Sequence, residues 1–192
     1  SMKEDLRVQR TKQMIRKAFL ELLGEKSFAE ITITEITEAA FCNRNTFYLH
    51  YEDKYALMET LCDEAVARLT ERLEEAGQAD YPSKEDFYTK VPDICMTLME
   101  EDILLYTNVF ARNGYPAFEA KYRQAIIDYI FKSYKVKNVD MKKKRMEVEY
   151  TTSGLIGAHR YWLLNYDEYS RADVLELFKD LSVQIGKLIF EQ

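Results

Sequence analysis

Glycine and proline are scarce in this chain, which has 6 Gly and 3 Pro in 192 residues. These residues interrupt regular structure most strongly, so their scarcity favours long helices over a fold with many tight turns. No apolar run approaches the roughly 18 residues of a membrane-spanning helix, and no N-terminal stretch has the pattern of a secretory signal. We therefore expect an all-α, cytoplasmic protein without a membrane segment.

Cysteine and histidine are also too few and too scattered to suggest a reactive or metal centre. The cysteines, Cys42, Cys62 and Cys95, form no C-x-x-C pair, and His50 is far from His159. The chain has no phosphate-binding glycine loop, no G-x-S-x-G and no H-E-x-x-H motif. Reduced core thiols are the simplest interpretation of the cysteines. We expect no enzyme activity, no metal and no cofactor.

Apolar and aromatic residues are abundant, at 47% and 13% of the chain. The net charge is −6, so any binding of nucleic acid must depend on local charge. The first helical segment, at about 5–23, is such a region. Its face opposite the apolar one carries Arg7, Arg10, Lys12, Arg16 and Lys17. A solvated basic face explains these residues as well as a nearby DNA phosphate does.

Two helix starts follow each other closely after this segment. Thr32 and Glu35 have the spacing of a capping box, in which each side chain satisfies a free backbone N–H of the other. Asn43 is a good N-cap for a second start. These signals predict a short helix, a three-residue turn at 41–43 and a second short helix at about 44–50. Two short helices joined in this way have the geometry of a helix-turn-helix.

The second short helix is basic and polar. No acidic residue occurs between Ala39 and Tyr51. Its first turn carries Arg44, Asn45 and Thr46, and Arg suits guanine as Asn suits adenine. Phosphate oxygens are within reach of Tyr48, His50 and the start of the next helix at Lys54. Charge and spacing alone leave open a DNA-reading helix or an ordinary helical hairpin with a basic face.

This region resembles the TetR family of bacterial transcriptional regulators. The resemblance covers about residues 7–60 and rests on Ile36-x-x-Ala39-Ala40 followed by Asn43-Arg44-Asn45-Thr46-Phe47-Tyr48-x-His50-Tyr51-x-Asp53-Lys54-x-x-Leu57. It implies that Arg44, Asn45 and Thr46 face the major groove. It also implies that the DNA backbone is held by Thr32, Tyr48, His50 and Lys54.

One position departs from the family pattern. Phe41 stands where the family often has Gly, and Phe is poor at a left-handed backbone angle. We therefore expect the turn to close differently, or Phe41 to tuck toward the core.

Helical patterns continue to the end of the chain. We expect helices at about 54–75, 83–99, 101–112, 116–135, 140–164 and 170–190, with Pro92 kinking or dividing the second of them. The predicted domains are a three-helix DNA-binding domain at 3–53, a connecting helix and linker at 54–80, and a helical ligand-binding and dimerisation domain at 81–192.

Small residues near position 155 suggest close packing of a helix. A glycine inside a helix lowers its stability by about 1 kcal/mol relative to Ala. Two glycines so close together therefore suggest that another helix packs against them, from the same chain or from a second copy. The resemblance implies a body that dimerises through its last two helices. We predict a homodimer on a near-palindromic DNA duplex. The interface residues we predict are Gly154, Gly157, Ala158, Leu181 and Ile185.

The resemblance also implies a small-molecule inducer, and the body is rich in Met and aromatic residues. For an apolar or aromatic effector we predict Met96, Met99, Tyr106, Phe110, Tyr129, His159 and Trp162. Such residues at helical spacing also suit a plain core. Three hypotheses follow: a repressor released by an effector, a DNA-bound regulator controlled by a protein partner and lacking a pocket, and a helical enzyme or scaffold. The third leaves residues 31–54 unexplained.

Overall fold

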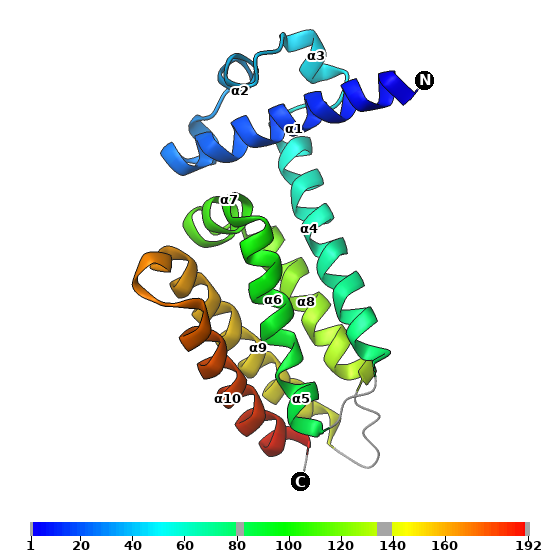
Figure 1. Ribbon diagram of the computed structural model, residues 1–192, viewed down its shortest axis with the longest axis vertical. Helices are drawn as coiled ribbons and strands as arrows, with labels where there is room; N and C mark the ends of the chain where they lie inside the picture. Colours follow the sequence, from blue (N-terminus) through cyan, green and yellow to red (C-terminus); the bar gives the residue numbers. More distant parts are fainter. Residues whose placement is uncertain (1, 80–82, 134–139, 191–192) are drawn as a thin grey trace.

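The computed structural model describes residues 2–79, 83–133 and 140–190. Throughout these ranges the regular structure is helical, which confirms the all-α prediction. Figure 1 shows a small N-terminal unit at one end of a larger helical bundle. The helices of this unit are α1 (Met2–Glu25), α2 (Ile33–Ala39) and α3 (Arg44–Tyr48), with a short 3-10 turn, η1 (Phe28–Glu30), before α2.

The long helix α4 (Lys54–Gly77) runs from this unit along the bundle and packs against α8 (Figure 1). The other elements of the bundle are α5 (Lys84–Tyr88), α6 (Lys90–Glu101), α7 (Ile103–Leu105), a π-helical segment η2 (Tyr106–Arg112), α8 (Pro116–Ser133), α9 (Met141–Leu164), the 3-10 turn η3 (Tyr166–Glu168) and α10 (Arg171–Phe190). No helix in the described ranges is long and apolar enough to cross a membrane.

Capping side chains begin the short helices where the sequence predicts. Thr32 Oγ1 accepts from Glu35 N at 3.2 Å, and Thr32 N donates to Glu35 Oε2 at 2.8 Å. Asn43 Oδ1 accepts from Thr46 N, and Asp53 Oδ1 accepts from Ala56 N, both at 2.8 Å. The capping predictions for α2 and α3 are therefore confirmed, and the Asn43 cap fixes where the turn between them ends.

The helix expected at 83–99 is divided, as Pro92 suggested, but at Thr89 rather than at the proline. Pro92 then lies in the first turn of α6, where its missing N–H has no intrahelical acceptor to lose. The segment expected as one helix at 101–112 becomes α7 and the π-helical η2. The predicted helix end at residue 135 and domain boundary at 80–81 lie outside or at the edge of the described residues.

Side chains of η2 and the following turn hold the last turn of α1. The buried Asn108 Nδ2 donates to Leu20 O at 2.9 Å, Asn113 Nδ2 donates to Leu23 O at 3.1 Å, and Arg112 Nη1 donates to Gly24 O at 3.1 Å. The last four carbonyls of a helix lack intrahelical donors, so the bonds to Leu23 O and Gly24 O complete the C-terminus of α1, and Asn108 adds a bond earlier in the helix, at Leu20 O. We call Asn108, Arg112 and Asn113 the amide clasp.

Gly24 lies in the last turn of α1, which ends at Glu25. A Cβ atom at Gly24 would lie 2.9 Å from Asn108 Nδ2. Gly24 therefore allows α1 to approach the amide clasp closely.

A second contact between the N-terminal unit and the bundle is an ion triad. Asp102, at the junction of α6 and α7, is 8% exposed. Its Oδ2 accepts a hydrogen bond from Arg16 of α1 and another, at 2.9 Å, from Arg68 of α4. Arg16 thus binds the bundle instead of lying on the solvated basic face expected from the sequence.

We predict that Asp102→Ala lowers the free energy of unfolding by about 1–3 kcal/mol, because two guanidinium groups lose a partly buried partner. Urea unfolding followed by circular dichroism measures the change. The matched control is Glu101→Ala, whose exposed carboxylate lies 3.5 Å from Arg72 and whose loss should cost no more than about 0.5 kcal/mol. Equal effects of the two substitutions would contradict the structural role of the triad.

Candidate nucleic-acid interface

The helix α3 presents a polar face to solvent. Its buried residue Phe47 packs in the core of the N-terminal unit with Phe19, Ile36 and Leu57. This packing turns Arg44 and Asn45 outward, where both are exposed. Among the described residues neither side chain has a hydrogen-bond partner, so both have free donors. Thr46 is less free, because its hydroxyl donates to Asn43 Oδ1 at 3.0 Å.

The turn before α3 closes with a left-handed residue. Phe41 has φ +53°, Phe41 N donates to Glu38 O at 3.2 Å, and Cys42 N donates to Thr37 O at 3.0 Å. These two bonds form a Schellman motif, which ends α2. The expectation that Phe41 avoids this angle or tucks inward is therefore wrong, because its side chain is 89% exposed. A phenylalanine held at this angle is strained by about 1–2 kcal/mol.

Two exposed apolar side chains beside α3 were missed from the sequence. Phe41 precedes the helix, and Leu49, 80% exposed, follows it. Apolar side chains on a surface that reads DNA can contact thymine methyl groups. The departure of Phe41 from the family pattern was the available signal, but it suggested only a different closure of the turn or a Phe41 side chain tucked toward the core.

The residues predicted to hold the DNA backbone have different surroundings. Tyr48 is 47% exposed. The Thr32 hydroxyl is engaged in its capping box, so the backbone N–H groups at the start of α2 are the donors there. His50 is half-buried, and its pKa lies below the usual 6.5 because of burial first and the charge of Lys12 second. His50 is therefore neutral at pH 7 and can donate to a phosphate without carrying a charge.

Lys54 is already engaged. Its ammonium donates to Phe28 O at 2.8 Å, Ala29 O at 3.1 Å and Ile31 O at 2.7 Å. The Nζ atom also lies 4.8 Å from the centre of the Phe28 ring. An ammonium has three donors, so none is left for a phosphate. These bonds argue against the predicted contact of the Lys54 side chain with DNA, whereas its backbone N–H at the start of α4 has no intrahelical acceptor.

Two family models match the chain. The model "Bacterial regulatory proteins, tetR family" matches residues 15–61, and the model "Transcriptional regulator C-terminal region" of the same family matches residues 93–184. The chain belongs to the TetR family. It is thus a transcriptional regulator with a helix-turn-helix DNA-binding unit.

Individual relatives agree with this assignment. Over 70 residues this TetR-family chain is 41% identical to an uncharacterized HTH-type transcriptional regulator, YxbF, of Bacillus subtilis (strain 168). That match covers 36% of this chain and 18% of the relative's length. The shared part is therefore short, and it carries no inference about the rest of that protein.

Solved structures of low identity share the fold. A TetR transcriptional regulator from Streptococcus agalactiae 2603V is 22% identical, with a TM-score of 0.62 over 94% of this chain and 98% of that one. A tetR-family regulator from Streptomyces coelicolor is 19% identical, with a TM-score of 0.65 over 92% of this chain and 81% of that one. The dihydroxyacetone kinase operon activator DhaS is 19% identical, with a TM-score of 0.57 over 95% of each chain.

In the body of this TetR-family regulator, most residues predicted for an effector belong to the core. Tyr106 and Phe110 form an aromatic cluster with Phe118 and Tyr122, with ring centroids 5.5–6.2 Å apart. The cleft between α8, α9 and α10 is lined by Tyr129 alone of the predicted set. The other predicted residues are buried and do not line it: Met96, Met99, Tyr106, Phe110, His159 and Trp162.

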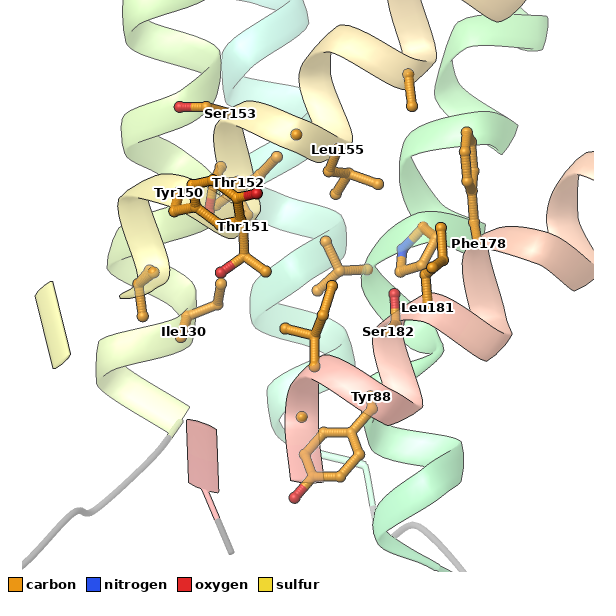
Figure 2. A pocket seen from close by; sticks show the side chains of 18 of the residues that line it. Tyr88, Ile130, Tyr150, Thr151, Thr152, Ser153, Leu155, Phe178, Leu181 and Ser182 are labelled. Atoms are coloured by element: carbon orange, nitrogen blue, oxygen red, sulfur yellow. The ribbon is translucent and has the colours of Figure 1, made fainter. Parts of the chain in front are cut away.

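That cleft lies between α8, α9 and α10, with residues of α5 and α6 at its base (Figure 2). Of the predicted dimer residues, Gly154, Ala158, Leu181 and Ile185 line it. A Cβ atom at Gly154 or Gly157 would meet nothing within 4 Å, so neither glycine has its packing reason within the chain.

We predict that Lys54→Met lowers the free energy of unfolding by about 1–3 kcal/mol, because three carbonyls lose their donor. Urea unfolding measures this effect, and the exposed Lys17→Met is the control. Under conditions where the variant is folded, its DNA affinity should keep the salt dependence of the unsubstituted protein, because no phosphate contact is lost. If the variant kept its stability but the slope of its salt dependence became smaller by about one, the result would show that Lys54 binds a phosphate.

Proposed function

We propose that this TetR-family regulator is a cytoplasmic repressor that reads a near-palindromic DNA site and is released by a small-molecule effector. The main support is the pair of free polar side chains, Arg44 and Asn45, on an acid-free helix whose start is held by Asn43. Arg44 suits the O6 and N7 atoms of guanine, and Asn45 suits adenine. Thr46, Tyr48, His50 and the backbone N–H groups near Thr32 and Lys54 would complete the contacts.

A homodimer is the second part of the proposal. An exposed stripe on α9 combines glycines with large exposed apolar side chains at intervals of three or four residues. Its members are Met146, Tyr150, Gly154, Gly157, Tyr161 and Leu164. On α10, Leu177 is 54% exposed and Leu181 is 43% exposed. Apolar surface of this extent on two helices suits a two-fold contact with a second copy.

Effector control is the third part, and it depends on the cleft. The alternative, control by a protein partner without a pocket, predicts a filled body, whereas the body has a cleft of about 700 Å³. In this proposal the N-terminal unit at 3–53 reads DNA, and the body at 81–192 binds the effector. The segment at 54–80 connects the two. A ligand changes DNA affinity only by binding one arrangement of the body better than another.

We predict that Arg44→Ala weakens binding to the cognate site by about 1–3 kcal/mol and relaxes the preference at one base pair of each half-site. The test is selection of bound duplexes from random DNA, followed by titration at several salt concentrations. Arg72→Ala, on the exposed side of α4, is the control. Absence of salt-sensitive binding by the unsubstituted protein to any selected duplex would reject the DNA-reading proposal.

We predict that Gly157→Leu leaves the fold of each chain intact, because nothing lies within 4 Å of the new Cβ, but dissociates the dimer. Analytical ultracentrifugation at micromolar concentration and thermal unfolding report these two properties separately. Ala120→Leu, an exposed small-to-large change on α8, is the control. An unsubstituted protein that sediments as a monomer would contradict the proposed dimer.

A further inference from the structure

The size and lining of the cleft between α8, α9 and α10 suit a small molecule. Its volume of about 700 Å³ lies within the range of about 300–1,000 Å³ that is usual for ligand pockets. Val91, Ile126, Val148 and Phe178 are among its apolar lining residues. At one end Tyr88 packs so closely on α10 that a Cβ atom at Gly186 would lie 2.5 Å from its ring (Figure 2).

The charges around the cleft argue against an ionic ligand. Of the described residues that line it, none is Lys, Arg or His. The one lining carboxylate, Glu147, already has a cation, because Lys144 Nζ lies 3.0 Å from its Oε2. A ligand anion would meet no positive charge, and a ligand cation would compete with Lys144. Burying an unpaired charge is far more costly than burying an apolar group.

Hydroxyl groups supply the polar part of the lining. Thr152 is 2% exposed, and its Oγ1 has no hydrogen-bond partner among the described residues. A buried hydroxyl without a partner is costly, so a ligand oxygen that accepts its proton would bind favourably. Thr151, beside Thr152 on α9, donates its own hydroxyl to Glu147 O, and Ser182 adds a hydroxyl from α10 (Figure 2). Thr152 and Ser182 thus offer donors to a ligand without offering charge.

From these observations we propose that the cleft binds an uncharged, largely apolar molecule with a carbonyl or ether oxygen that accepts a hydrogen bond from Thr152, and that it rejects carboxylates of the same length. This ligand class deepens the proposed function and rests on it for any effect on DNA. Binding itself is a separate property of the body and can be measured without DNA.

The test uses Nile red, an uncharged fluorescent probe, bound to the full-length protein. Two competitors with the same chain, methyl dodecanoate and dodecanoate at pH 8, should differ at least about tenfold in the concentration that displaces the probe. Equal displacement by the two would overturn the proposal. Failure of the probe to bind the unsubstituted protein would also overturn it, because the cleft would then be closed to ligands in solution.

Two variants test the assignment to this cleft. Thr152→Val keeps the shape and removes the hydroxyl, so it should weaken the ester about tenfold and leave hexylbenzene, which lacks an acceptor, unchanged. Ser182→Lys places a cation in the lining, so it should raise the affinity for dodecanoate about tenfold without strengthening the ester. Unchanged affinities in both variants, with thermal unfolding as the check of folding, would place the ligand elsewhere.

DNA release is measured separately, on the duplex selected by the unsubstituted protein. Preferential binding of the ester without release of DNA would support the ligand class and reject the effector function. Loss of the ester preference, with DNA binding intact, would reject the ligand class and leave the DNA-reading function standing.

Discussion

The position of the DNA-reading unit depends on how the bundle holds the last turn of α1. Three side chains of the amide clasp donate to carbonyls of α1, and Asp102 binds Arg16 from the same side. Buried Asn108 cannot lose its bond to Leu20 O without leaving polar atoms unpaired. Because α1 packs on α2, and α2 on α3, the clasp is connected to α3 through packed helices.

The π-helical segment η2 carries part of the clasp and lies between α1 and α9. In this segment Asn113 N bonds to Asn108 O, five residues back, and Tyr115 N bonds to Val109 O. Such segments are rare in proteins overall, and those that occur are often found at functional sites. The segment η2 packs on α1 with one side and on α9 with another. A change in α9, which lines the cleft, therefore has a short physical route to α1.

Local rules made the N-terminal unit predictable, whereas the site in the body depends on tertiary packing. Thr32, Asn43 and Asp53 begin their helices because the capping interaction spans only three residues. By contrast, the partners of Lys54 lie 23–26 residues away, and no local pattern separates a phosphate-binding lysine from one that holds carbonyls. Tyr106 and Trp162 are of the residue types that often line ligand sites, but the packing of the helices places them in the core. The cleft lies beside Thr152, which no local sequence pattern singles out.

The cleft and the proposed dimer contact share residues, and this overlap has a thermodynamic consequence. Gly154 and Leu181 belong both to the lining of the cleft and to the exposed face of α9 and α10. If a second copy covers that face, it also covers part of the cleft opening, so a ligand and the second copy affect each other's affinity reciprocally. A ligand that fills the cleft without projecting from it would strengthen the dimer while changing its geometry. A bulkier ligand that projects past Gly154 would oppose dimer formation. The size of the ligand would then decide whether DNA release occurs by rotation of intact dimers or by their dissociation.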